Sequence, residues 1–207
     1  MKTSSTRSFS AVARPLSVAL TALAWLTGCV TIKEYSFELD YSSGKLIRGY
    51  HDLRSQKDSD DDYSLEKDWA SLKEQMDDDK PTYEPAVARD LSKELFEEEG
   101  LLSARTTHQV ACPQCFPSKT ALLAWLHDDD AWRFEEINDE IFLILAGRKK
   151  VLSTNGQILE SARNTMIVWP AEAEHFAYRV EDESSGGESL LPLYLKEEAA
   201  QPEKPLQ

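Results

Sequence analysis

The feature that most constrains the fold is a series of short apolar segments in the carboxyl-terminal half, each followed by a tight-turn signal. We expect strands at 132–137, 141–146, 150–153, 158–160, 165–169, 175–180 and 190–195. The turn signals include Asn138-Asp139, Gly147-Arg148 and Asn155-Gly156, and the last of these favours a type I′ hairpin. Parallel neighbours need crossovers of about a dozen residues, so these turns predict an antiparallel β-meander.

The amino-terminal part of the body predicts a β-hairpin. Tyr35, Phe37, Leu39 and Tyr41 alternate with polar residues, which is typical of a strand with one buried face. Ser43-Gly44 supplies a turn before a return strand that ends near residue 53. A second strand-like segment spans residues 103–110.

Helical spacing of apolar residues predicts three helices. The first runs from Ser64 to Met76, and the second begins near Pro85 and ends at Gly100. The second carries Val87, Leu91 and Leu95 on one stripe. The third follows a cap at Ser118 and contains residues 122–126.

Together these elements predict one α+β domain over residues 29–198, with an N-terminal β-hairpin, two to three helices and a C-terminal antiparallel meander. The helices should cover one face of the meander, because a sheet with an apolar face must bury it. Acidic loops are expected near residues 55–63 and 77–84, and a disordered tail at 199–207.

The first 28 residues have the layout of a secretory signal peptide. Lys2, Arg7 and Arg14 precede an apolar run over residues 16–26 that is too short to span a bilayer. The sequence Leu26-Thr27-Gly28-Cys29 resembles the lipobox of bacterial lipoproteins. This resemblance implies cleavage before Cys29, lipid attachment to its sulfur and acylation, for example by palmitate, of the freed amine.

The resemblance also implies a location in the cell envelope, with the membrane as one partner through the lipid anchor. In many Gram-negative lipoproteins an aspartate after the lipidated cysteine retains the protein at the inner membrane, and here that position is Val30. The resemblance thus favours the outer membrane over the inner one. The globular domain would lie in the periplasm or be exposed outside.

The charge of the body excludes one class of partner. Removing three basic residues with the signal leaves 20 basic against 37 acidic residues, a net charge of −17 over 179 residues. A surface this acidic repels phosphate backbones, so nucleic acid is not an expected partner. A domain of this length has enough residues for one sizeable core.

Two cysteines, Cys112 and Cys115, remain if Cys29 carries lipid, and three interpretations of the pair stay open. An even count in an oxidising compartment favours a local disulfide. The order strand, Cys-x-x-Cys, helix resembles thioredoxin-like proteins, although Pro117 and the many antiparallel strands depart from that pattern. Finally, His108 and His127 could complete a zinc site with the two cysteines.

Catalytic motifs and cofactor fingerprints are not found in the sequence, and Asp58-x-Asp60-x-Asp62 begins like a calcium loop but does not continue as one. We therefore expect no catalytic residues, metal or cofactor. The leading hypothesis is a non-enzymatic, lipid-anchored envelope protein that binds or scaffolds an unidentified envelope protein or ligand. The alternatives are a periplasmic thiol-disulfide oxidoreductase using Cys112 and Cys115, and a carrier of an apolar small molecule.

Overall fold

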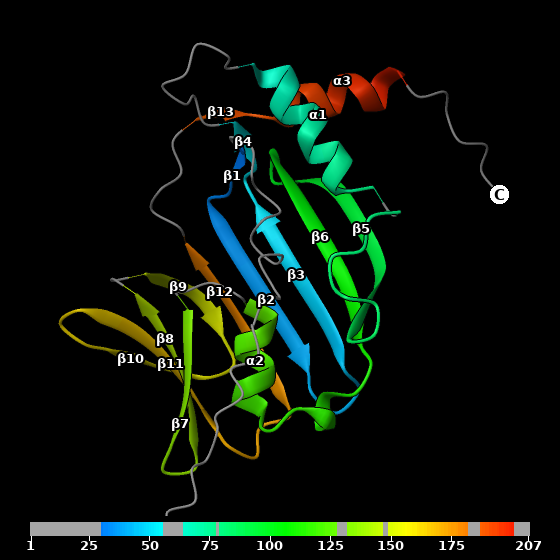
Figure 1. Ribbon diagram of the computed structural model, residues 1–207. Helices are drawn as coiled ribbons and strands as arrows, with labels where there is room; N and C mark the ends of the chain where they lie inside the picture. The colour runs from blue at the N-terminus through cyan, green and yellow to red at the C-terminus, as the bar shows by residue number, and fades with distance from the viewer. Residues whose placement is uncertain are drawn as a thin grey trace, which may run out of the picture.

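The computed structural model describes residues 30–55, 64–77, 79–127, 132–146, 149–181 and 187–200. A six-stranded antiparallel sheet with the order β5-β6-β3-β2-β12-β9 is the centre of the fold (Figure 1). Its strands are β2 (Glu34–Asp40), β3 (Lys45–His51), β5 (Ala88–Glu98), β6 (Leu101–Val110), β9 (Lys150–Thr154) and β12 (His175–Glu181).

Two smaller antiparallel sheets complete the β-structure. The four-stranded sheet has the order β10-β11-β8-β7, and the three-stranded sheet has the order β1-β4-β13. The remaining elements are β1 (Val30–Thr31), β4 (Arg54–Ser55), α1 (Leu65–Gln75), the 3₁₀ turn η2 (Pro113–Cys115), α2 (Lys119–His127), β7 (Trp132–Ile137), β8 (Glu140–Ala146), β10 (Gln157–Glu160), β11 (Asn164–Pro170), β13 (Glu188–Ser189) and α3 (Leu191–Ala200).

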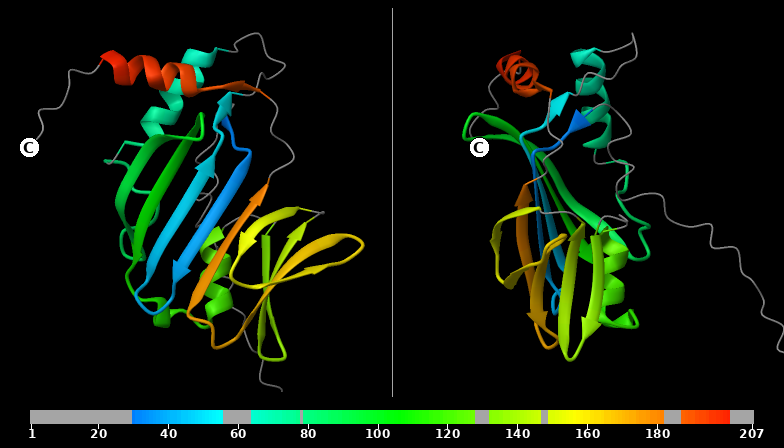
Figure 2. Two further views of the ribbon diagram at one scale, coloured as in Figure 1. Left: turned by 180° about the vertical axis from the view of Figure 1, so that it is seen from behind. Right: turned by 90° about the vertical axis from the view of Figure 1, so that its left-hand side faces the viewer.

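The two faces of the six-stranded sheet have different surroundings. One face, which we call the covered face, packs against α2 and the four-stranded sheet, and their side chains form the larger core. The core includes Phe37 and Leu39 from β2, Leu123 from α2 and Leu143 from β8. The other face, the open face, has none of the described elements lying across β2, β3 and β12 (Figure 2, left).

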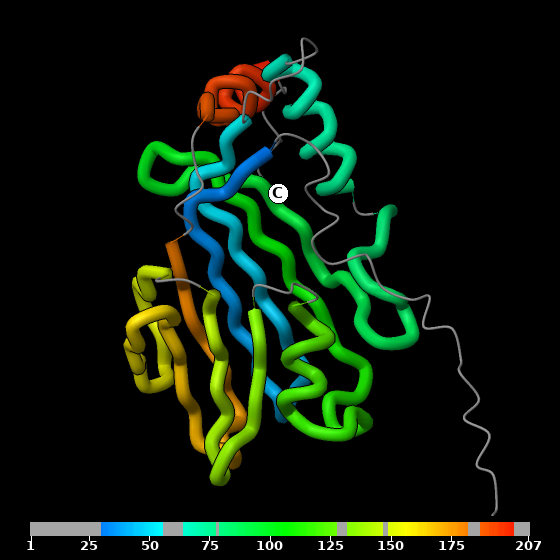
Figure 3. Tube along the Cα trace, turned by 60° about the vertical axis from the view of Figure 1, so that its left-hand side comes forward, coloured from blue at the N-terminus to red at the C-terminus, as the bar shows by residue number. Residues whose placement is uncertain are grey.

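A second, smaller core lies at one end of the six-stranded sheet. There α1 and α3 lie side by side next to the three-stranded sheet (Figures 1 and 3). Leu53, Trp69 and Leu190 are among its buried side chains. Trp69 also donates its indole N–H to Glu197 at 2.8 Å, which ties α1 to α3.

Many of the expected elements are confirmed, beginning with the α+β class and the antiparallel pairing. The hairpin of β2 and β3 turns at Gly44, whose φ of 74° suits glycine. Ser64 caps α1 by accepting from the Lys67 amide, and Ser118 accepts from the Ala121 amide at the start of α2. Asn138 and Asp139, both at positive φ, form the tight turn between β7 and β8.

The helix predicted over residues 85–100 is wrong, because this segment is the edge strand β5. It pairs with β6 along its whole length, with a bulge between Asp90 and Ser92. Glu99 and Gly100, at φ 54° and 78°, form the two-residue turn of this hairpin. The apolar residues that suggested a helix do not share one buried stripe, since Leu91 is 49% exposed whereas Leu95 packs against the smaller core.

The strand predicted at 190–195 is also wrong, because residues 191–200 form α3. Pro192 lies in its first turn, where proline is tolerated, and the buried Leu190 anchors its start in the smaller core. The predicted tail therefore begins too early, since Ala199 and Ala200 are helical; residues 201–207 lie outside the described residues.

The predicted hairpin at Asn155-Gly156 does not form, and the strands of the carboxyl-terminal half do not follow the chain order of a meander. β9 joins the six-stranded sheet while β10 joins the four-stranded one. At this corner the Asn155 side chain accepts from the indole of Trp169 at 2.8 Å and the amide of Ala177 at 2.9 Å. A Cβ at Gly156 would lie 2.8 Å from Trp169, so glycine permits the close approach of the sheets.

Among the described residues, no helix has the length and apolar character needed to cross a membrane. The signal segment, Cys29, the acidic run at 56–63 with its calcium-like start, and the Gly147-Arg148 turn signal lie outside the described residues.

Candidate functional site

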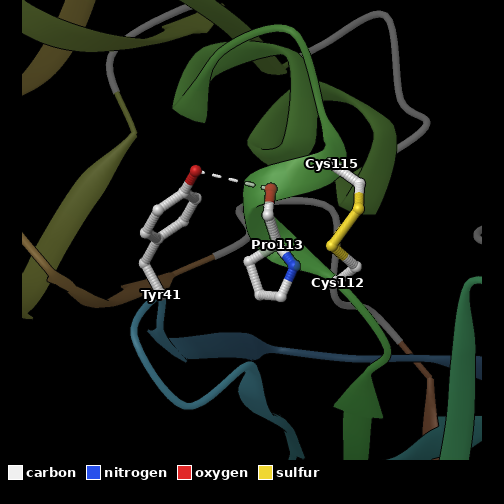
Figure 4. The surroundings of a disulfide bond; sticks show 4 residues. All are labelled: Tyr41, Cys112, Pro113 and Cys115. Atoms are coloured by element: carbon white, nitrogen blue, oxygen red, sulfur yellow. Dashed lines mark hydrogen bonds between the residues drawn. A yellow bond between two sulfur atoms is a disulfide. The ribbon is translucent and has the colours of Figure 1, made fainter.

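Cys112 and Cys115 form a disulfide, with their Cα atoms 5.3 Å apart. Cys115 is exposed and Cys112 is half-buried at the 3₁₀ turn between β6 and α2. The Tyr41 hydroxyl donates to the Pro113 carbonyl at 3.4 Å, so the loop packs on the β2–β3 turn (Figure 4). A helix dipole lowers the pKa of a thiol in the first turn of the helix. Because α2 begins only at Lys119, both sulfurs lie outside that turn.

The side chains weighed as an alternative zinc site are not brought together. His108 contacts Asp90 and Thr106 in the six-stranded sheet, whereas His127 contacts Leu123 and Tyr178. The two cysteines are bonded to each other, and an oxidised pair does not bind zinc. The described residues contain no cluster of three or more side chains suited to hold a metal ion.

The least expected polar group on the covered face is the guanidinium of Arg48, at the middle of β3. Its cross-strand neighbours are Phe37 on β2 and Thr106 on β6. Arg48 is only 2% exposed, and its Nε and Nη2 atoms have no hydrogen-bond partner among the described residues. None of the ion pairs between described residues includes it.

Aromatic rings surround this cation. The guanidinium carbon lies 5.2 Å from the ring centroid of Tyr83, a cation–π contact. Burial by itself lowers the pKa of Arg48, but the phenol groups of Tyr35, Tyr83 and Tyr50 raise it above its ordinary value. Arg48 is therefore charged in the folded protein. We call Arg48 with these three tyrosines, His108 and His127 the Arg48 cluster.

Both histidines of the cluster are neutral and fully hydrogen-bonded. Desolvation lowers the pKa of His108 to about 4. For His127, desolvation and then repulsion from Arg48 lower the pKa to about 3. Nδ1 of His127 donates to the Leu123 carbonyl at 2.7 Å, so its Nε2 accepts from the hydroxyl of Tyr178. Neither ring can supply negative charge to Arg48.

The nearby carboxylate of Asp90 is already used by other donors. It accepts from the amide and hydroxyl of Thr82, at 2.9 and 2.8 Å, and from His108 Nδ1 at 2.7 Å. Lys93, whose side chain is fully buried, lies 3.1 Å from the same group. Desolvation would raise the pKa of Asp90, but these hydrogen bonds outweigh it and lower the pKa, so Asp90 is ionised.

A buried cation without a carboxylate partner is costly, because removing an ion from water costs several kcal/mol unless charge and hydrogen bonds compensate. The tyrosine rings compensate part of this cost, and two guanidinium nitrogens still have donors to offer. Planar guanidinium groups match carboxylate and phosphate oxygens in pairs. The chemistry of the Arg48 cluster is therefore suited to an anionic group with an apolar body.

This site was missed at the level of sequence, although a signal for it exists. Leu46, Arg48 and Tyr50 alternate along the predicted return strand, so the alternation places Arg48 on the same face as two apolar residues. An arginine at an inward position of a strand is the signal. Its tyrosine neighbours come from β2, β3 and a loop before β5, which only the fold brings together.

Comparison of the chain with protein families, curated proteins and solved structures finds no match.

Proposed function

We propose that the protein is a lipid-anchored protein of the cell envelope that binds a small anionic molecule with an apolar body at Arg48. The observation that carries the binding proposal is the buried, charged guanidinium with two nitrogens that no described residue accepts from. The aromatic surroundings favour a ligand whose remainder is apolar. This proposal is a more specific form of the predicted binding role.

The proposed anchor is supported by the lipobox, Leu26-Thr27-Gly28-Cys29, which follows the basic and apolar segments of a signal peptide. Expressed in a Gram-negative host, the wild-type chain should partition with membranes, and intact mass should show a diacylglyceryl group and an added acyl chain. Cys29→Ser should give a soluble or uncleaved form. An unmodified sulfhydryl at Cys29 in mature material would refute the anchor without affecting the binding proposal.

The binding proposal can be tested with a matched pair of probes, octanoate and octanol, which share an apolar chain and differ in charge. Octanoate should raise the melting temperature by mass action, since it would bind only the folded state, and octanol should raise it much less. Arg48→Met should abolish the octanoate response. Arg105→Met is the control, because Arg105 is an exposed arginine of the same sheet.

The same variant tests whether Arg48 is a ligand-binding or a structural residue. Replacing an unpaired buried cation by an apolar side chain of similar length should raise the free energy of unfolding of the ligand-free protein by about 1–4 kcal/mol. If Arg48→Met is instead destabilised and octanoate, benzoate and phosphate leave the wild-type melting temperature unchanged, Arg48 serves packing and the binding proposal fails.

A thiol-disulfide oxidoreductase is a second candidate, favoured by the exposure of Cys115. Such an activity would accelerate the reduction of insulin by dithiothreitol, and Cys112→Ser would remove it. A reduction potential of the pair below about −300 mV would mark the bond as structural.

A further inference from the structure

On the open face, three polar side chains from three strands form a continuous hydrogen-bonded array. Ser36 Oγ on β2 lies 3.1 Å from His51 Nε2 on β3, and His51 Nδ1 lies 3.1 Å from Glu98 Oε2 on β5. A serine, a histidine and a carboxylate joined in this order through opposite ring nitrogens is the signature of a serine activated by a general base.

The register of the sheet produces this array. Ser36 pairs with Gly49, and His51 lies two residues further along β3 on the same face. A Cβ at Gly49 would lie 2.2 Å from Ser36 Oγ and 2.8 Å from His51 Nε2. Only glycine at this position leaves the space in which the two side chains meet.

The protonation state of His51 suits a base. The Glu98 carboxylate can only accept, so Nδ1 carries the proton and Nε2 accepts from the Ser36 hydroxyl. Desolvation, reinforced by Arg179 on β12 and opposed by Glu98 and by Glu34 on β2, lowers the pKa of His51. The imidazole is therefore neutral at pH 7 with its lone pair directed at the serine.

A cation lies on the strand next to Ser36. Arg179 is the direct cross-strand neighbour of Ser36 on β12. Glu34 binds Nε and Nη2 of Arg179, both at 2.6 Å, which leaves Nη1 for an incoming oxygen. The backbone amides of β2 and β3 here are used in the sheet, so a side chain has to stabilise an oxyanion at this site.

We propose that the open face hydrolyses carboxylic esters, with Ser36 as nucleophile, His51 as general base and acid, Glu98 as positioning residue and Arg179 as oxyanion stabiliser. This inference depends neither on the lipid anchor nor on Arg48, whose side chain points to the covered face.

The reaction has two balanced steps. Ser36 Oγ adds to the ester carbonyl while its proton passes to His51 Nε2, and the carbonyl oxygen becomes an oxyanion beside Arg179. Collapse breaks the bond to the leaving alkoxide, which takes the proton from His51, so an alcohol departs and an acyl ester of Ser36 remains. Water then loses a proton to His51, attacks this ester, and releases the carboxylic acid as the proton returns to Ser36 Oγ.

The test uses p-nitrophenyl butyrate hydrolysis and a fluorophosphonate probe on the purified full-length chain. The probe should label wild type at Ser36, as located by peptide mass spectrometry. Ser36→Ala should abolish labelling and lower kcat/KM by about 10²–10⁴-fold. Ser153→Ala is the matched control, because Ser153 is the other cross-strand neighbour of Arg179 and has no histidine partner in the described structure. It should leave both readouts unchanged.

Two further variants distinguish catalysis from folding. Gly49→Ala should abolish labelling while Ser36 itself is still present, and circular dichroism should show that the sheet is retained. Glu98→Gln should lower kcat with little change in KM and shift the acidic limb of the kcat–pH profile to lower pH, since Glu98 raises the pKa of His51.

The proposal is overturned if wild type does not react with the probe under conditions that label a known serine hydrolase, or if Ser36→Ala is labelled as fast as wild type. A folded Ser36→Ala protein with unchanged ester turnover would overturn it as well.

Discussion

The two faces of the six-stranded sheet differ in whether the polar side chains of their candidate sites all have hydrogen-bond partners. On the covered face, Arg48 is a buried cation whose Nε and Nη2 have no partner among the described residues. On the open face, one residue further along the same strand, Gly49 makes room for Ser36 and His51 to bond to each other. The covered face has a cation without an anionic partner in the described part of the chain, and the open face has polar side chains that are hydrogen-bonded to each other.

Strand alternation separates two kinds of site within one short stretch of sequence. Successive residues of β3 contribute to different sites because their side chains point to opposite faces. Neither site forms a linear motif, because the partners of Arg48 and of His51 arrive from other strands through the register.

The largest effect expected is a contrast between adjacent residues of β2. Leu39 is fully buried on the covered face, and Leu39→Ala should lower the free energy of unfolding by about 2–5 kcal/mol through lost burial and a cavity. Glu38→Ala on the open face should change it by no more than about 0.5 kcal/mol. Urea denaturation measures both, and similar losses at the two positions would mean that the open face is covered in solution.

The next effect is a pH dependence that comes from the covered face. The folded pKa of His108, about 4, lies below the ordinary histidine value, so the unfolded chain binds this proton first as the pH falls. The contribution of His108 to the free energy of unfolding is therefore fully present above about pH 6.5. It is lost between there and pH 4, and amounts to on the order of 3 kcal/mol.

Urea denaturation at pH 7.0 and 4.5 tests this sign, with His108→Asn as the variant. His108→Asn should reduce the loss of stability between the two pH values, even though it is less stable at pH 7. A stability that rises on acidification would contradict the neutral, buried histidine.

A smaller effect is expected for the disulfide, which closes the loop leading from β6 into α2. Replacing both cysteines by serine should cost about 2 kcal/mol, because a four-residue ring removes little entropy from the unfolded chain. Wild type reduced with dithiothreitol should show the same loss in thermal denaturation. A much larger loss would mean that the covering helix depends on this bond.

The smallest effect is expected in the β5–β6 turn, where backbone conformation alone determines how a substitution changes the free energy of unfolding. Glu99 has φ 54°, which asparagine tolerates better, so Glu99→Asn should raise the free energy of unfolding by up to about 1 kcal/mol. Gly100→Ala should lower it, although a Cβ there would meet nothing within 4 Å. Calorimetry of both variants checks the opposite signs.

Local signals predicted those elements whose stability is decided locally. Ser64 and Ser118 cap their helices through bonds to amides three residues further on, and Ser43-Gly44 and Asn138-Asp139 form turns between strands that are adjacent in sequence. The alternation of Phe37 and Leu39 with polar residues also indicated the covered face correctly.

Elements decided by tertiary pairing were predicted wrongly. Residues 88–98 are rich in helix formers, but the long ladder with β6 outweighs that propensity. The residues after Leu190 form a helix because α1 offers Trp69 and a core on which that helix packs. Asn155 bonds across two sheets instead of closing a hairpin, and no local pattern predicts such a contact.

The candidate sites depended on register in the same way. Cys112 and Cys115 are close in sequence and could be paired from spacing alone, whereas the metal hypothesis failed because His108 and His127 point to separate partners. The contact between Ser36 and His51 follows from a hairpin whose turn was predicted, so counting residues back from that turn would have found it. Glu98 could not be placed, since its segment was expected to be a helix.

β1 begins at Val30, one residue after the proposed site of lipid attachment, Cys29. Val30 is buried and paired with Ser55, so a lipid on the preceding residue would be joined to the folded domain without a flexible linker. The domain would then lie directly against the bilayer and could contact only molecules at the membrane surface. Each flexible insertion of n residues between positions 29 and 30 would add roughly 5–6 Å times the square root of n to its range.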